Sequence, residues 1–164
     1  MSQLPSLGRR GEGWVAVQMI LLALVAWSGL LGPAWTNGLR LASSSVGLVL
    51  IAAGLMLAGL GLRHLSARDA LTPLPHPRDD ARFVQTGAYA IVRHPVYSGL
   101  IAGATGWGLL AASPATLVVA AVLFAFFELK SRREEAWLMH RYAEYADYRA
   151  RTPRLIPWIG GSRD

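Results

Sequence analysis

Residues 94–127 read HPVYSGLIAGATGWGLLAASPATLVVAAVLFAFF, a run of 34 residues without Asp, Glu, Lys or Arg. The run is too long for one upright crossing of a bilayer, because a hydrocarbon core of about 30 Å takes roughly 20 helical residues. Ser113 and Pro114 interrupt its middle, and proline both breaks a helix and suits the first turn of the next one. The run therefore predicts a tight hairpin of two membrane helices, residues 96–112 and 114–127 or slightly beyond.

Two earlier runs also lack these four residue types, residues 13–39 and 41–62, with 27 and 22 residues. Each is long enough for one helical crossing. The apolar run 14–31 exceeds the roughly 7 to 15 residues of a signal-peptide core, so we expect an uncleaved first span. The predicted fold class is all-α integral membrane, with four transmembrane helices.

The basic residues indicate how these spans are oriented. With both termini in the cytoplasm, fifteen of the sixteen Lys and Arg residues lie on the cytoplasmic side, and only Arg40 lies on the other. This is the distribution that the positive-inside rule describes, and it predicts an integral membrane protein, of the inner membrane in a bacterium. It also accounts for the pI near 10.5 without a nucleic-acid partner. Cysteine is absent from the sequence, which excludes disulfides and thiolate chemistry.

Two polar segments remain, residues 63–93 and 128–164, and this topology places both in the cytoplasm. Three alternating prolines in residues 72–77 predict an extended strap over the membrane surface. Residues 128–149 contain neither Gly nor Pro and predict an amphipathic C-terminal helix that continues from the fourth span. We expect an N-terminal two-span region, 1–62, and a second region, 63–164, that carries the chemistry.

Residues 86–99, TGAYAIVRHPVYSG, place a cationic, polar and aromatic cluster at the cytoplasmic mouth of the third span. Arg93 and His94 are expected at the entrance, with Tyr97 just inside the headgroup level. A purely structural interpretation stands beside the functional one, because arginine before a span and tyrosine at the interface are common. The small residues that follow predict close helix packing; they are Gly99, Ala102, Gly103 and Gly106.

The second cluster combines adjacent carboxylates with aromatic rings one and two turns away. Glu134 and Glu135 are followed by Tyr142, Tyr145 and Tyr148. Carboxylates beside aromatic rings suit a cationic cofactor that carries an aromatic ring. The structural alternative is an exposed charged helix with ordinary salt pairs.

Together the two clusters resemble the isoprenylcysteine carboxyl methyltransferase family and related small integral-membrane methyltransferases, including phospholipid methyltransferases. The likeness covers about residues 77–157. The matching residues are Gly87-Ala-Tyr89, Arg93-His-Pro-Val-Tyr-Ser-Gly99, Glu134-Glu-Ala-Trp-Leu138, Tyr142, Tyr145, Tyr148 and Arg154-Leu-Ile-Pro157. The sequence departs from the family pattern at Ala88, where proline is frequent, and at Tyr142-Ala143, where Phe-Gly is usual.

The resemblance implies a membrane methyltransferase that uses S-adenosylmethionine and methylates a lipid or lipidated acceptor. It implies that His94, Tyr97 and Gly99 border the methionine part of the cofactor. It assigns catalytic roles to Arg154, Glu135 and His94, with Arg154 orienting a substrate anion or the cofactor carboxylate. The cofactor-binding set that it implies is Tyr89, Arg93, His94, Pro95, Tyr97, Gly99, Glu134, Glu135, Leu138, Tyr145 and Tyr148.

The sequence leaves several alternatives open. A carboxylate acceptor needs only orientation, whereas an amine acceptor must lose a proton to a base such as Glu135 or His94. A non-enzymatic membrane scaffold and a nicotinamide-dependent membrane reductase are the alternative functions. No metal is expected, because His64, His76 and His140 are scattered, and no Gly-x-Gly-x-x-Gly motif marks a dinucleotide site. The oligomeric state and the identity of the acceptor are not indicated.

Overall fold

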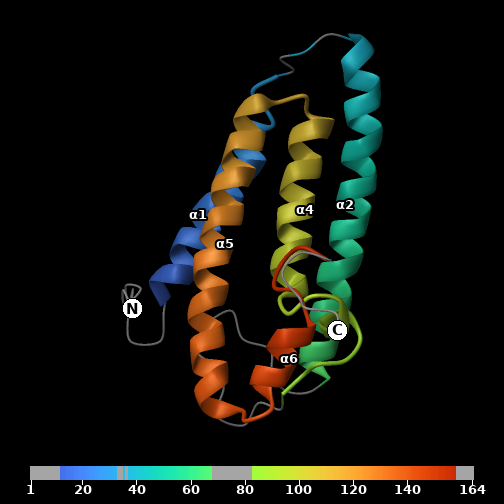
Figure 1. Cartoon of the computed structure of the whole chain (residues 1–164). Helices are drawn as coiled ribbons and strands as arrows, with labels where there is room; N and C mark the ends of the chain where they lie inside the picture. The colour runs from blue at the N-terminus through green and yellow to red at the C-terminus, as the bar shows by residue number, and fades with distance from the viewer. Residues whose placement is uncertain (1–11, 33–34, 36, 68–82, 158–164) are drawn as a thin grey trace.

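The computed structural model describes residues 12–32, 35, 37–67 and 83–157, and within them every regular element is a helix. Figure 1 shows α1, α2, α4 and α5 side by side, with the short α6 near the lower end of α5. The helices are α1 (Glu12–Ser28), α2 (Asn37–Ser66), α3 (Ala88–Ile91), α4 (Pro95–Leu110), α5 (Pro114–Arg141) and α6 (Tyr145–Arg151). Two of them, α2 and α5, are long and apolar enough to cross a membrane. At 17 and 16 residues, α1 and α4 are shorter.

The hairpin predicted between residues 96 and 127 is present as α4 and α5. Ser113 is the N-cap of α5, its hydroxyl accepts a hydrogen bond from the Thr116 amide at 3.2 Å, and Pro114 occupies the first turn. Ala112 has a positive φ of 52°, the left-handed conformation that ends many helices. The predicted break at Ser113-Pro114 is thus confirmed.

Helix α4 packs closely along α2 through glycines. A Cβ atom built on Gly99 would lie 2.4 Å from the carbonyl oxygen of Gly54, and one on Gly106 would lie 2.6 Å from that of Gly47. Contacts this short leave no room for a side chain, so the two backbones touch. The prediction that Gly99 and Gly106 serve packing is confirmed, and the partner helix is α2.

Helix α1 lies against α5 and α4, and aromatic side chains fill the space between them. The ring centroids of Trp14 and Phe126 are 5.6 Å apart, and Leu123 and Phe127 are fully buried beside them. Many large apolar side chains of α1 and α2 are exposed instead, and exposed apolar surfaces are typical of sites that contact a membrane or another protein.

The predicted continuous helix over residues 128–149 is wrong in its last third. Helix α5 runs unbroken through the apolar segment but ends at Arg141, and Tyr142 adopts an extended conformation before α6 begins at Tyr145. No Gly or Pro marks this break. The turn instead brings the rings of Tyr142 and Tyr145 against Phe83, so tertiary contacts override helix propensity. The strap predicted at residues 72–77 lies outside the described residues.

Candidate active site

The two sequence clusters meet where the segment after α6 crosses the start of α4. The amide of Arg93 donates to the carbonyl of Pro153 at 2.8 Å, and the amide of His94 donates to the carbonyl of Arg154 at 3.1 Å. The Ser98 hydroxyl donates to the Leu155 carbonyl at 2.6 Å. These bonds to three successive carbonyls fix the C-terminal segment against α4.

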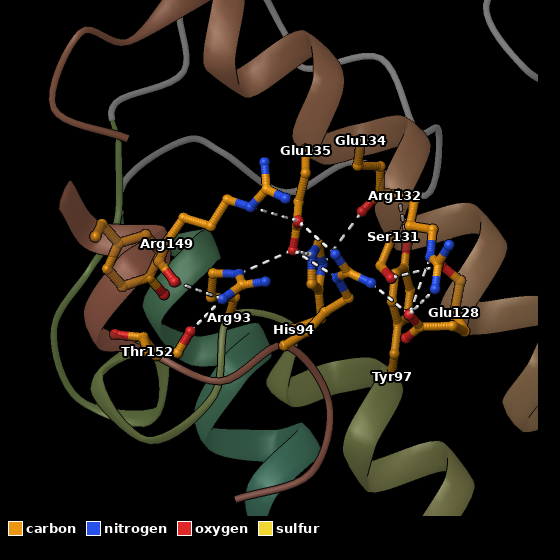
Figure 2. A network of polar contacts seen from close by, with 12 residues as sticks. Arg93, His94, Tyr97, Glu128, Ser131, Arg132, Glu134, Glu135, Arg149 and Thr152 are labelled. Atoms are coloured by element: carbon orange, nitrogen blue, oxygen red, sulfur yellow. Dashed lines mark hydrogen bonds and ion pairs between the residues drawn. The ribbon is translucent and has the colours of Figure 1, made fainter. Parts of the chain in front are cut away.

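Glu135 lies at the centre of the site and is only 2% exposed. Figure 2 shows its carboxylate pointing toward Arg93 and His94. Its Oε1 accepts a hydrogen bond from Nε of Arg93 at 2.8 Å and from Nε of Arg154 at 3.1 Å, and His94 Nε2 is 3.3 Å away. One buried carboxylate therefore joins the Arg-His-Pro segment to the C-terminal segment. The sequence alternative of a solvated charged face is wrong for Glu135.

His94 is buried between two carboxylates. Its Nδ1 is 3.4 Å from Glu134 Oε2, and its Nε2 is 3.3 Å from Glu135 Oε1. Burial alone would lower the pKa of His94, but the two adjacent carboxylates outweigh it, so this pKa is raised above 6.5. The two carboxylates thus favour the charged form of the imidazole, in which both ring nitrogens donate. Arg93 and His94 lie directly before α4, and both side chains are buried.

Tyr97 connects His94 to the apolar core. Its ring stacks on His94 at 5.5 Å and on Phe127 at 4.4 Å, measured between ring centroids. Its hydroxyl donates to Oε1 of Glu134. Tyr97 thereby fixes one carboxylate and one face of the imidazole.

Arg93 binds the C-terminal segment of the chain. Besides Glu135, its guanidinium donates through Nη1 to the carbonyl of Arg149 at 3.0 Å and to that of Thr152. These bonds tie α5, α6 and the start of α4 together. Two other predicted site residues, Pro95 and Gly99, face α2 and pack against it.

Four aromatic rings form a cluster in which three tyrosines pack on Phe83; the tyrosines are Tyr142, Tyr145 and Tyr148. The Tyr148 hydroxyl donates to the Tyr89 carbonyl at 2.6 Å, which joins α6 to α3. Burial raises the pKa of the Tyr89, Tyr145 and Tyr148 phenols, so all three stay protonated. Within the described part of the chain, the buried hydroxyl of Tyr145 has no hydrogen-bond partner.

A cavity of about 510 Å³ opens on the other side of Glu135. Three guanidinium groups and one carboxylate reach it. Arg154 also pairs with Glu128, which Arg132 bonds as well. The cavity is lined by Arg132, Glu135, Ala136, Met139, His140, Arg149 and Arg154.

Some site residues were not predicted from the sequence. Phe83 precedes the Gly-Ala-Tyr motif and carries no polar signal, although three tyrosines pack on it. Arg149 lies 3.9 Å from Glu135 and lines the cavity, which only the turn after α5 makes possible. Of the predicted site residues, Glu135 and Arg154 line this cavity, whereas the others, including the half-buried Leu138, are not part of its lining. The described residues contain no cluster of His, Asp and Glu suited to a metal ion.

The sequence profile of the phospholipid methyltransferase family matches residues 42–145, which include most of α2, all of α4 and α5, and most of the site. The chain belongs to this family. The resemblance to membrane methyltransferases seen in the two motifs is thereby confirmed. Together with the two long apolar helices, family membership identifies a membrane protein.

Named relatives fall into two groups. The chain is 26% identical over 150 residues to a nickel-cobalt-cadmium resistance protein of Alcaligenes xylosoxydans xylosoxydans, covering 91% of this chain and 64% of that protein. It is 29% identical over 139 residues to protein-S-isoprenylcysteine O-methyltransferase of Mus musculus, covering 84% of this chain and 47% of that enzyme. With the Saccharomyces cerevisiae enzyme of the same name it shares 39% over 82 residues, or 49% and 34% of the two chains. The chain thus spans less than two thirds of these relatives.

Proposed function

We propose that the protein is a membrane methyltransferase that uses S-adenosylmethionine to methylate a lipid-like or prenylated acceptor. One observation carries the proposal: the Arg-His-Pro segment and the Glu-Glu segment meet at the buried carboxylate of Glu135, beside a cavity of about 510 Å³. Cavities that hold small molecules have volumes of roughly 300 to 1,000 Å³. Family membership supports the same reaction class.

The residues present fit the chemical groups of this cofactor. A guanidinium such as Arg154 suits its carboxylate, and the carboxylates of Glu134 and Glu135 suit its cationic ammonium and sulfonium groups. The tyrosines of α6 provide aromatic surface and one unpaired hydroxyl, that of Tyr145, for the adenosyl part. The structure accommodates both positions at which the sequence departs from the family pattern. Ala88 is buried, and the ring of Tyr142 stacks on Phe83.

When bound, S-adenosylmethionine supplies an electrophilic methyl group. The chain has to orient the acceptor in line with it and to exclude water. Arg154, half-buried at the cavity, can orient an anionic group, while Arg93 holds the segment that carries Arg154. His94 and Tyr97 fix the positions of the two glutamates.

The pairing of His94 and Glu135 favours an acceptor that is already anionic. Glu135 accepts hydrogen bonds from two guanidinium groups, which makes it a poor base. The two carboxylates beside His94 favour its protonated imidazole, which has no lone pair to take a proton. A carboxylate acceptor needs no base, whereas an amine does. We therefore favour carboxyl methylation over amine methylation.

The direct test is a labelled-methyl assay on purified protein. We expect the protein to bind S-adenosylmethionine and to transfer label to a component of membrane lipid extracts or to a prenylated cysteine. A base-labile label identifies a methyl ester and a stable one identifies an N-methyl product. A folded protein that binds no S-adenosylmethionine would contradict the proposal. Displacement of bound S-adenosylmethionine by a nicotinamide dinucleotide would favour a reductase. A cellular function that survives replacement of Glu135, in a protein that transfers no methyl group, would favour a scaffold.

We also propose four membrane spans, α1, α2, α4 and α5, with both termini in the cytoplasm. The absence of cysteine makes single-cysteine labelling free of background. An impermeant maleimide is expected to label Leu31→Cys, in the turn after α1, in intact cells. It is expected to label Ala143→Cys, between α5 and α6, only after permeabilisation. The reverse pattern would overturn the orientation, and labelling of both variants in intact cells would overturn the span count.

A further inference from the structure

Lys130 is the single lysine in the sequence, whose other 15 basic residues are arginines. Its side chain is 1% exposed and lies on the side of α5 that faces α1. A charged side chain buried in a helix bundle is costly unless it is paired, and lysine is seldom fully buried without a partner. Lysine also differs from arginine in presenting a compact point charge on a flexible stem. The position of this residue therefore needs an explanation that the site described so far does not provide.

The ammonium group contacts residues of α1 and α4. Nζ donates to Oε1 of Gln18 on α1 at 2.6 Å. It also lies 5.1 Å from the centroid of the Tyr97 ring, within the range of a cation–π interaction. The negative charge of Glu134 acts on Lys130 as well. Lys130 thus touches the membrane helix α1 on one side and the Tyr97–Glu134 pair on the other.

The Tyr97–Glu134 pair leads directly to His94. The planes of the Tyr97 and His94 rings are inclined by only 4°, and Oε2 of Glu134 lies 3.4 Å from Nδ1 of His94. Displacing Lys130 would remove the ammonium group from the face of the Tyr97 ring and from the neighbourhood of the Glu134 carboxylate. Gln18, which binds Lys130, lies on α1, outside the residues 42–145 that match the family. Helix α1 therefore contacts the site at a position that the family match does not include.

We propose that Lys130, held by Gln18, is a positioning residue for the methyl transfer proposed above: it fixes Tyr97 and Glu134 against His94 and makes α1 part of the site. This role rests on the proposed function. It places no new group in contact with the reacting atoms. It assigns α1 a part beyond anchoring the chain in the bilayer.

The kinetic test compares Lys130→Met with wild type in detergent. Methionine keeps the unbranched apolar part of the side chain but removes the charged group, and kcat/KM is expected to fall roughly 10- to 100-fold, as when a buried polar group loses its partner. Gln18→Leu is expected to change kcat/KM in the same direction by a smaller factor. Arg63→Met removes an exposed cation from the end of α2 and is the matched control, expected to be unchanged.

A spectroscopic test separates this role from one in packing alone. Because Lys130 is the sole lysine, ¹⁵N-lysine labelling gives one side-chain Nζ resonance. We expect that resonance to shift on addition of S-adenosylhomocysteine, and to shift in Glu134→Gln without ligand. Wild-type protein that binds no S-adenosylhomocysteine would overturn the proposed function and this role together. Wild-type protein that binds and transfers methyl groups, with an Nζ resonance that does not respond and unchanged kcat/KM in Lys130→Met, would overturn this role alone.

Discussion

Glu135→Gln is expected to lower kcat/KM by about 100-fold or more, the size of loss that follows when catalytic groups move out of position. The amide keeps the shape of the side chain but removes the charge that pairs with Arg93, Arg154 and His94. Three cationic groups then face each other at a site where the glutamate was 2% exposed. Isothermal titration with S-adenosylmethionine and the labelled-methyl assay measure the loss.

The same substitution should also lower the free energy of unfolding, by about 3 kcal/mol or more, because it breaks a buried ion-pair network from one side. Thermal unfolding and circular dichroism show whether the variant is folded at the assay temperature. Glu144→Gln is the matched control, because Glu144 is exposed at the start of α6, and its effect should stay within about 0.5 kcal/mol. A folded Glu135→Gln protein with wild-type cofactor affinity would remove Glu135 from the site.

Parts of the architecture could be predicted from the sequence because local physical chemistry decides them. The charge-free run 94–127 is too long for one helical crossing of a bilayer, so a break between two helices was expected. Ser113 supplies the cap of the second helix and Pro114 suits its first turn. The two polar clusters lie on opposite flanks of the α4–α5 hairpin, so an antiparallel hairpin returns them to the same end of the bundle. The structure then shows that they share one buried carboxylate, Glu135.

Other features could not be predicted because they depend on partners that are distant in the sequence. Helix α5 ends after Arg141 without Gly or Pro, since the rings of Tyr142 and Tyr145 gain contact with Phe83 by leaving the helix. The pairing of Gln18 with Lys130 joins residues 112 positions apart. Neither residue belongs to a motif, and a single glutamine in an apolar span gives no sign of its partner.

The second large effect is expected at the α2–α4 contact, which holds the start of α4 and therefore His94 and Tyr97 in place. In Gly99→Ala the new Cβ would lie 2.4 Å from the Gly54 carbonyl oxygen and 2.7 Å from the Ala58 Cβ atom. Both neighbours belong to rigid helix, so the two helices must separate. We expect a loss of about 1 to 3 kcal/mol in the free energy of unfolding, as for other overpacked cores.

Gly103→Ala provides the control, because it changes the same residue type one turn further along α4. A Cβ atom there would meet no heavy atom within 4 Å, so only the helix propensity changes. Alanine gains roughly 0.5 to 1 kcal/mol over glycine inside a helix, so Gly103→Ala should unfold at the wild-type temperature or slightly above it. Gly99→Ala should unfold below it and lose methyl transfer. Equal melting temperatures for the two variants would mean that α2 and α4 do not touch at Gly99, and the positions of His94 and Tyr97 would then need another support.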